Sequence, residues 1–436
     1  MKTRKILVIF FFLGLCTGLF AQNKGVVYGG KTIQRLEGVN IYLHKDTVGI
    51  GITDKEGEFD IKPLSALAEE DTLTFSYVGY ETLKISLEKL KKMNYLVILA
   101  DKVQQLGEVS ITGSSLQEYL HWEPETTIPH SKGLFAYASV VAKNKIYIIG
   151  GDESQLYKPK STDEMELRNE FYNPKIYIYD TLTKEWSESK CRLRARAYHN
   201  AHYYKGRIYL FGGKNLSTNR KFEYLDATTE IYDIEKDMVV VDPVNPHQAV
   251  NFASFIWGDQ IFAFGGSDKQ QMNGKSYSAK GHLFDLKTGC WYELQPMPFP
   301  KEAKGILVDS VFYLLGGYGN KKPLFFIETY DLRTGKWRDV GRLPVRMARP
   351  GIVRRGDIIY LYEESKLQAY DMKSQNIRVY RTDMPVANAE LFCIGEQLYI
   401  IGGAVFDDIN ISPSPLMLSL NLNELEKTEC QSFTAN

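Results

Sequence analysis

The chain has 436 residues, and its 53 basic side chains are balanced by 53 acidic ones, so the formal net charge at pH 7 is zero. This balance argues against a nucleic-acid-binding surface and gives no sign of attraction to anionic membranes. Aromatic residues make up 13% of the chain, which favours strands, and the five cysteines show no CxxC or Cys/His spacing, so neither a disulfide scaffold nor a cysteine metal site is expected.

Residues 1–21 have the composition of a secretory signal peptide. Basic residues precede the apolar run ILVIFFFLGL, and small residues follow up to Ala21, after which we expect cleavage. Cys16 leaves lipid attachment open as an alternative, although the bulky Leu15 makes a poor lipobox. No later segment reaches the roughly 18 apolar residues of a transmembrane helix. We therefore expect an exported protein, in the periplasm or associated with the outer membrane or cell surface.

Residues 23–113 are predicted to form a small antiparallel β-sandwich, because short strand-like runs alternate with turn signals. The runs are GVVYG, VNIYLH, VGIGITD, EFDIKP, DTLTFSYVGY, TLKISL, NYLVILA and EVSIT. The TDKEGEF and FSYVGY segments resemble the carboxypeptidase regulatory-like domain, which precedes many TonB-type outer-membrane receptors and secreted proteins of Gram-negative bacteria. The resemblance implies a module without catalytic chemistry. Asp54 and Glu56 fit a solvated turn better than a calcium site, and residues 114–118 are the expected linker.

Residues 119–436 contain a nineteen-residue segment that recurs six times without a gap. Five copies end in a glycine pair after an apolar run: Gly150-Gly151, Gly212-Gly213, Gly265-Gly266, Gly316-Gly317 and Gly402-Gly403. The fifth copy has Glu363-Glu364 instead. Successive doublets are about 40 to 60 residues apart, the spacing of four-stranded propeller blades, so six blades are predicted.

The second half of each repeat adds an aromatic-Asp pair and, in several copies, a tryptophan six residues later, as in Asp180 with Trp186. Together with the glycine doublets these residues resemble the kelch repeat, which implies an all-β protein, a sandwich followed by a six-bladed kelch-type β-propeller. The glycines would permit backbone angles that other residues resist. The tryptophans would fill the wedge between neighbouring blades: Trp122, Trp186, Trp291 and Trp337.

A propeller must also close its ring. The spacing of Trp122 and Pro129 matches that of Trp337 and Pro344 in a complete repeat, so the segment around Tyr119–Trp122 is predicted to join the sixth blade. Residues 425–430 are the alternative closing strand. Either route removes exposed strand edges.

Polar residues gather where each inner strand begins, on the rim that also carries the long loops after the doublets. Because these strands start at the channel mouth, we expect a polar ligand-binding entrance. Its predicted members are Arg349, Lys304, Glu302, Glu390, His199, Asn200, Asn251 and Asn388. The alternative is that the charges neutralise one another around a water-filled channel.

Three functional classes follow from this pattern. The first is a non-catalytic binding or scaffold protein of the bacterial envelope, expected to be a monomer, whose partner is a glycan, a small polar ligand or an envelope protein. The second, by family resemblance, is an enzyme such as a sialic-acid mutarotase, with Glu302 or Glu390 as base and Arg349 or Lys304 holding an anion; a copper radical oxidase is disfavoured because the seven histidines form no suggestive group. The third is a structural surface protein. No catalytic residue, metal or cofactor is assigned.

Overall fold

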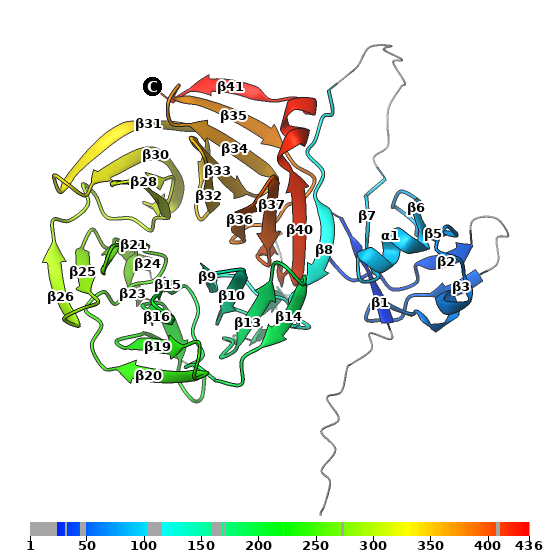
Figure 1. Ribbon diagram of the computed structural model, residues 1–436, viewed down its shortest axis with the longest axis horizontal. Coiled ribbons are helices and arrows are strands. Elements are labelled where there is room, and N and C mark those ends of the chain that lie inside the picture. Colours follow the sequence, from blue (N-terminus) through cyan, green and yellow to red (C-terminus); the bar gives the residue numbers. More distant parts are fainter. Residues whose placement is uncertain are drawn as a thin grey trace, which may run out of the picture.

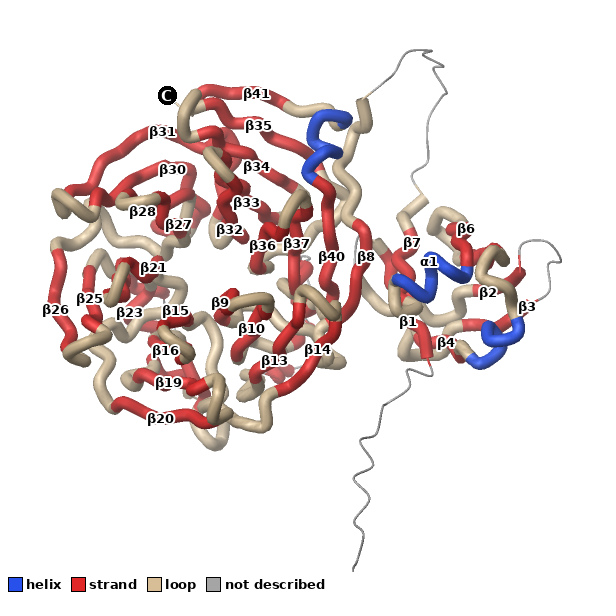
Figure 2. The backbone as a smooth tube through the Cα atoms, viewed as in Figure 1, coloured by secondary structure: helices blue, strands red, loops and turns tan. Residues whose placement is uncertain are grey.

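The computed structural model describes residues 24–30, 33–43, 49–102, 116–157, 167–169, 171–220, 222–271, 274–406 and 410–435. A ring of sheets occupies most of the molecule, and a smaller two-sheet unit lies beside it (Figure 1). The predicted signal peptide lies outside the described residues, as do residues 114 and 115 of the predicted linker 114–118. Helix is confined to a few short segments, as the tube in Figure 2 makes plain.

The N-terminal unit is a sandwich of two sheets around its own apolar core. One sheet contains β4 (Glu58–Asp60), β1 (Lys24–Gly29) and β7 (Leu96–Leu99); the other contains β3 (Gly49–Ile52), β2 (Asn40–Leu43), β5 (Thr72–Ser76) and β6 (Leu83–Ser86). Inward-facing side chains alternate along these strands, and Val27, Phe59 and Phe75 meet in the core. A short 3-10 turn, η1 (Lys62–Ala66), connects β4 towards β5.

Two details of this unit differ from the sequence expectation. β1 pairs with β7 in parallel, so the sandwich is mixed rather than antiparallel. The helix α1 (Leu87–Lys92) follows β6: the Ser86 side chain accepts a hydrogen bond from the Lys89 amide, and Leu87 and Leu90 are buried. α1 lies in the connection from β6 to β7, in which the chain passes from one sheet to the other. The predicted EVSIT strand lies outside the described residues.

Six sheets among the described residues form the ring, numbered here as blades 1 to 6 in order of their inner strands. Blade 1 has β9 (Ala138–Ala142), β10 (Lys145–Ile149), β13 (Ile176–Asp180) and β14 (Glu185–Glu188). Blade 2 has β15 (Asn200–Tyr204), β16 (Arg207–Phe211), β19 (Thr229–Asp233) and β20 (Met238–Asp242). Blade 3 has β21 (Ala253–Trp257), β22 (Gln260–Phe264), β25 (Gly281–Asp285) and β26 (Cys290–Leu294).

The other three blades follow the same antiparallel order from the channel outward. Blade 4 has β27 (Gly305–Val308), β28 (Val311–Leu315), β30 (Lys322–Asp331) and β31 (Lys336–Met347). Blade 5 has β32 (Gly351–Arg355), β33 (Ile358–Glu363), β34 (Lys366–Asp371) and β35 (Asn376–Arg381), with β41 (Gln431–Thr434) as a fifth strand. Blade 6 has β36 (Glu390–Ile394), β37 (Gln397–Ile401), β40 (Leu416–Asn421) and β8 (Glu123–Thr127).

The doublets join each blade to the next through backbone atoms. In all six copies the amide of the second doublet residue donates, over 2.8 to 3.0 Å, to a carbonyl at the point where the chain enters the following blade; for Gly317 this is Met347, the last residue of β31. The glycines have left-handed backbone angles, and a Cβ on Gly402 would lie 2.5 Å from the carbonyl oxygen of Leu134. Glycine is therefore needed at position 402 both for its backbone angles and because the next blade leaves no room for a side chain.

The aromatic residues of the repeat fill the spaces between blades, as predicted. Trp291 of blade 3 packs on Phe211 of blade 2, and Trp337 of blade 4 packs on Phe264 of blade 3. The repeated aspartates stabilise turns within a blade. Asp180, for example, accepts hydrogen bonds from the Leu182 and Thr183 amides and so closes the turn between β13 and β14.

The first and last segments of the propeller close the ring together, in the place predicted near Trp122. The closing strand β8 begins one residue after Trp122 and pairs with β40, while the Trp122 ring is buried against Tyr362 of blade 5. The alternative closing segment is wrong. Residues 425–430 begin within the 3-10 turn η2 (Leu422–Lys427), and the chain then adds β41 to blade 5.

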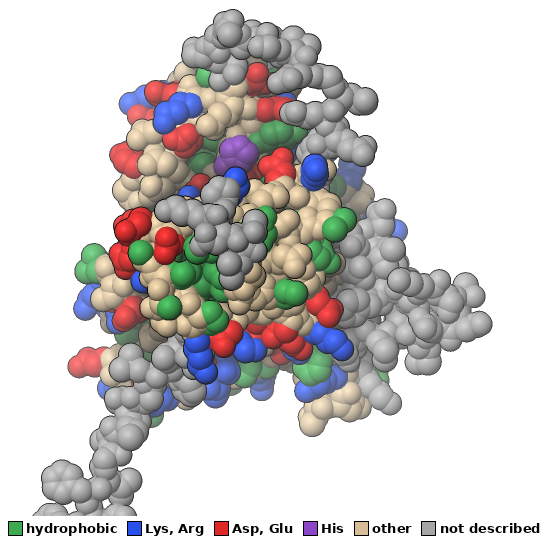
Figure 3. Space-filling view, turned by 90° about the vertical axis from the view of Figure 1, so that its right-hand side faces the viewer, with side chains coloured by type: hydrophobic (Ala, Val, Ile, Leu, Met, Phe, Trp, Pro, Cys, Tyr) green, Lys and Arg blue, Asp and Glu red, His purple; other side chains and the backbone are tan. Residues whose placement is uncertain are grey.

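The sandwich contacts the propeller at this closure. Tyr28 and Leu96 belong to the same buried apolar cluster as Trp122 and Leu418, and Lys89 forms an ion pair with Glu123 at 3.6 Å. On the face of the molecule that carries the sandwich, acidic and basic side chains are intermixed (Figure 3). The sandwich therefore covers the blade in which the ring is sealed.

Candidate functional site

The loops that enter the inner strands share one rim with the loops that follow the doublets. Isolated β-bridges tie the two kinds of loop together in five blades: Phe135 to Asp152, Ala197 to Lys214, Val250 to Ser267, Glu302 to Tyr318 and Ala387 to Ala404. Four of the post-doublet strands also form one small sheet, in which β38 (Ala404–Phe406) and β39 (Asn410–Pro413) continue into β11 (Gln155–Tyr157) and β12 (Leu167–Asn169). This sheet joins blades 6 and 1 across the ring closure.

A chain of backbone hydrogen bonds runs around the mouth inside this rim. The Tyr198 amide donates to Ala136 O at 2.7 Å, the Asn251 amide to Tyr198 O at 3.2 Å, and the Ala303 amide to Asn251 O at 3.0 Å. Ala136, Tyr198, Asn251 and Asn388 have φ between 49° and 62°. The left-handed backbone is sparsely populated by such residues and is held here by the contacts between blades.

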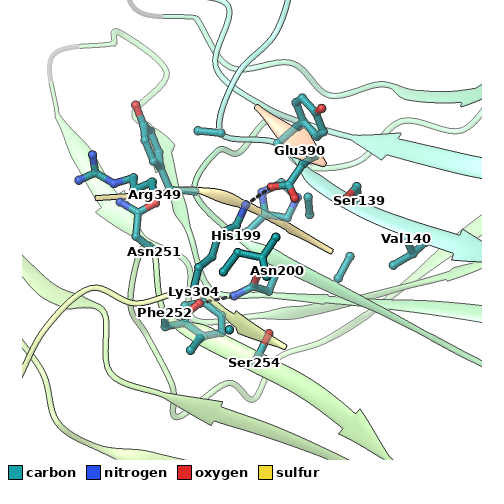
Figure 4. Close-up of a pocket in the computed structure, with 18 of the residues that line it drawn as sticks. Ser139, Val140, His199, Asn200, Asn251, Phe252, Ser254, Lys304, Arg349 and Glu390 are labelled. Carbon is teal, nitrogen blue, oxygen red and sulfur yellow. Dashed lines mark hydrogen bonds and ion pairs between the residues drawn. The ribbon is translucent and has the colours of Figure 1, made fainter. Parts of the chain in front are cut away.

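A cavity of about 410 Å³ lies at the mouth, and side chains or backbone from all six blades line it. Seven of the eight residues that the sequence placed at the entrance border this cavity: His199, Asn200, Asn251, Lys304, Arg349, Asn388 and Glu390. Figure 4 shows most of them around a common space. A volume of this size falls within the range of small-molecule sites.

Lys304 and Glu390 form an ion pair in the cavity, with Nζ and Oε1 2.5 Å apart (Figure 4). Lys304 immediately precedes the inner strand of blade 4 and Glu390 begins that of blade 6, so the ion pair spans the start of the inner strand of blade 5. Residue 351 of that blade is a glycine and has no side chain to intervene. Both charged side chains remain partly exposed, at 31% and 21%.

Glu302 does not reach the cavity, which corrects its predicted role. Its side chain is fully buried, accepts a hydrogen bond from Ser267 at 2.7 Å and forms an ion pair with Arg349. Unlike Tyr198 and Asn251 at the matching position of their repeats, Glu302 does not have a left-handed backbone. Its carboxylate therefore anchors Arg349 from behind.

His199 contributes to the cavity wall, but its ring lies between blades 1 and 2. A Cβ on Gly150 would be 2.8 Å from its Cε1 atom, so the ring fills the interblade space as Phe252 does against Gly212. Burial and the nearby Arg196 charge lower the pKa of His199 well below its usual value. This histidine is therefore neutral, and its predicted direct contact with a ligand is not supported by its orientation.

Deeper in the cavity, His202 and Ser254 form a polar pair that the sequence analysis missed. The His202 Nε2 and Ser254 Oγ atoms are 2.8 Å apart, and both residues line the cavity. Burial lowers the pKa of His202 to about 4, so its ring is neutral at pH 7. Its place two residues after Asn200 on the same strand was the available signal, because side chains at i and i+2 share a strand face.

Tyr198 and Arg349 occupy the upper wall. The Tyr198 hydroxyl donates to Asp152 at 2.8 Å, and Lys214 lies 4.9 Å from the Tyr198 ring centroid. The Arg349 guanidinium lies 5.4 Å from the centre of the Tyr318 ring. Aromatic faces and hydrogen-bonding tips thus stand together at the entrance, as sites for hydroxylated ligands require.

Comparison with protein families identifies both parts of the chain. The model described as the KLHDC2/KLHL20/DRC7 Kelch-repeats domain matches residues 136–363, which is 228 of the 436 residues. The chain belongs to the kelch-repeat family. A second model, the CarboxypepD_reg-like domain, matches residues 23–111, and the two resemblances inferred from the sequence are thereby confirmed.

The curated relatives match only part of this chain. Human Kelch repeat and BTB domain-containing protein 8 is 26% identical over 207 residues, covering 44% of this chain and 29% of its own length. Human Kelch-like protein 23 is 25% identical over 251 residues, 48% of this chain and 42% of its own length. Beta-scruin of Limulus polyphemus is 26% identical over 255 residues, 52% of this chain and 27% of its own length. The chain therefore spans less than half of each of these relatives.

A solved structure shows the same fold. The structure of YjhT superposes with a TM-score of 0.51 at 13% identity, covering 68% of this chain and 99% of YjhT. In the part of the chain that the structure describes, no helix is long and apolar enough to cross a membrane. Those same residues include no group of three or more His, Cys, Asp or Glu side chains with the geometry of a metal site.

Proposed function

We propose that this chain is an exported, non-catalytic binding protein of the bacterial envelope, whose propeller holds a small polar ligand, such as a sugar unit of a glycan, at the channel mouth. The observation that supports this most is the cavity of about 410 Å³ to which all six blades contribute. Amide, hydroxyl, ammonium and carboxylate groups converge there on a rigid ring, with aromatic faces above them. Such an arrangement fits a hydroxylated molecule.

Export is part of the proposal and is supported by the sequence of residues 1–21 and by the carboxypeptidase regulatory-like module that follows. We further propose that the sandwich docks this binding propeller to another envelope component. Because it covers the closing blade on the side of the ring, it leaves the channel mouth accessible to a ligand.

Binding is favoured over catalysis because of how the two candidate carboxylates are held. Glu302 is buried in contact with Arg349, and Glu390 is paired with Lys304. A general base must be free to reach and accept a proton of the substrate, whereas each of these carboxylates already contacts a cation of the chain. A sugar mutarotase remains the alternative function, and Glu390 would be its base, since it is the one of the two carboxylates that borders the cavity.

The test is a monosaccharide and glycan screen on the chain from residue 22 onward, followed by calorimetry. Replacing Lys304 by Met removes a charged donor and should weaken binding by about 1.5 to 3 kcal/mol, or roughly tenfold and more. Lys205→Met is the matched control, because Lys205 is exposed and lies outside the cavity. Equal affinity in both variants would move the site to the rim loops or the sandwich. Accelerated anomer exchange in NMR spectra, lost in Glu390→Gln, would instead establish the mutarotase.

A further inference from the structure

Three cations at the mouth have carboxylate partners among the described residues. Lys304 pairs with Glu390, Arg349 with Glu302, and Lys214, which lies beside Tyr198, with Glu223. Each pair links residues from the rim or the inner strands. The mouth is therefore polar and locally charged without offering an unpaired cation among the described residues that border it.

Two further carboxylates lie in the same region and are held by uncharged donors. Asp152 accepts hydrogen bonds from the Tyr198 hydroxyl at 2.8 Å and from the Ser154 amide at 2.9 Å. Glu363 accepts hydrogen bonds from the Ala348 and Arg349 amides at 2.6 and 2.8 Å. Burial raises the pKa of both groups and keeps His199 and His202 neutral by lowering theirs. The net charge of this described surround is at or below zero.

An anionic ligand would therefore meet a specific obstacle in the cavity. To reach Lys304 it would have to displace Glu390, leaving a partly buried carboxylate without its cation, which is costly. A hydroxyl group has no such difficulty. The ammonium has three donors and the carboxylate has several acceptor positions, so a hydroxyl can accept from Lys304 and donate to Glu390 while the pair stays intact.

We propose that the mouth selects uncharged, hydroxyl-rich ligands and that Glu390 is the residue that excludes anionic ones. This proposal rests on the proposed function of the propeller as a binding protein for a small polar ligand, and it names the chemical class. Glu390 acts through its ion pair with Lys304. Removing the charge of Glu390 would leave the Lys304 ammonium unpaired and facing the cavity, so that the neutral site would become cationic.

The experiment compares sugars that differ only in a carboxylate: galactose with galacturonate, and glucose with glucuronate. Calorimetry on the wild-type protein should detect one of the neutral sugars and show at least tenfold weaker binding of its uronate. In Glu390→Gln the uronate should gain at least tenfold while the neutral sugar weakens. Glu396→Gln is the matched control on the same blade, because Glu396 is exposed and pairs with Arg355 instead. It should leave both affinities unchanged.

A second measurement does not depend on finding the right sugar. Acetate, titrated at constant ionic strength, should leave the melting temperature of the wild type unchanged and should raise that of Glu390→Gln. The variant Lys304→Gln/Glu390→Gln removes both charges and should lose this acetate response, which verifies that the response comes from Lys304.

The outcomes separate the two proposals. Wild-type protein that binds a uronate as well as its neutral counterpart, or that acetate stabilises, overturns the selection of neutral ligands while a binding function stands. If no neutral sugar binds although acetate stabilises only Glu390→Gln, the sugar-binding function is refuted, while the charge-based exclusion of anions by Glu390 is supported.

Discussion

Blades 5 and 6 each receive a strand from an opposite end of the propeller, and the two additions differ in what they bury. In blade 6 the N-terminal strand β8 takes the fourth position, and Trp122 just before it is 5% exposed. In blade 5 the C-terminal strand β41 is a fifth strand beyond a complete blade, and all four of its residues are exposed. The first addition seals the ring, whereas the second covers an edge that is already formed.

This comparison indicates that pairing alone does not measure a strand's contribution to stability. Both strands make an antiparallel ladder, but backbone hydrogen bonds to a surface strand replace bonds to water and contribute little net free energy. The buried apolar surface at the tryptophan is what distinguishes them.

The largest expected effect tests that distinction directly. Replacing Trp122 by Ala should lower the free energy of unfolding by about 3 to 5 kcal/mol, because a large ring leaves a packed site. Phe433→Ala on β41 should cost less than about 1 kcal/mol, since Phe433 is 39% exposed. Chemical denaturation of both variants, with a chain ending at Glu429 as a third sample, measures the difference. A C-terminal truncation that costs as much as Trp122→Ala would show that β41 is part of the closure.

The two blades also differ at the doublet, where blade 6 has Gly402-Gly403 and blade 5 has Glu363-Glu364. The Glu364 amide still donates to Val386 O at 3.0 Å, so the bond between blades survives without glycine. The Glu363 carboxylate meanwhile captures two amides at the start of the inner strand. Blade 5 thus keeps the backbone connection and changes the surrounding side chains.

Substitution within blade 6 separates the two reasons for glycine. Gly402 and Gly395 have nearly equal φ values, 60° and 61°, but only Gly402 has a backbone carbonyl where a Cβ would lie. Gly395→Ala should therefore cost only the left-handed backbone strain, about 1 to 2 kcal/mol. Gly402→Ala should cost about 3 kcal/mol or more, because Leu134 must move as well. Equal losses in denaturant unfolding would show that crowding is unimportant at the doublet.

In blade 5 the corresponding substitution concerns a carboxylate. Glu363→Ala leaves the Ala348 and Arg349 amides without their acceptor in a buried place and should cost about 1 to 3 kcal/mol. Glu364→Ala removes an exposed side chain and should change stability by less than about 0.5 kcal/mol. Thermal melts of the pair give the ranking, and Glu363→Gln should lie between them because it retains an acceptor oxygen. The reverse order would assign the doublet's role to Glu364.

The smallest effect concerns the link between the two blades at the closing segment. The Nδ1 atom of His121 lies 3.0 Å from Oδ2 of Asp383, and this hydrogen bond raises the pKa of the histidine. The protonated form is therefore favoured in the folded protein. Its contribution to stability is present below about pH 6.5 and is lost as the pH rises through the higher folded-state value. The pair is well exposed, so His121→Gln should cost at most about 1 kcal/mol at pH 5.5 and less at pH 8. A larger loss at pH 8 would contradict this sign.

The repeats made the ring predictable, because each doublet and each Trp recurs with the same physical role. The backbone conformations and side-chain orientations at the mouth depend on packing between blades, which the sequence pattern does not reveal. Glu302 and Asn251 occupy equivalent positions, but the backbone at Asn251 is left-handed and that at Glu302 is not, and no residue pattern distinguished them. His199 packs between blades because it replaces an aromatic residue of neighbouring repeats. The sequence also did not reveal the parallel pairing of β1 with β7, nor the helix α1, whose six residues are too short for a clear helical period.

The backbone bond from each doublet to the next blade has a consequence for how such a protein changes over time. Since both partners are main-chain atoms, replacing a side chain elsewhere in the blade removes neither partner of these hydrogen bonds. Residues of the inner strands at the mouth can therefore be replaced individually while these hydrogen bonds between blades stay intact. The ring can therefore keep its shape while the side chains at the mouth vary, and under the binding function proposed above a single replacement of Glu390 would change the specificity.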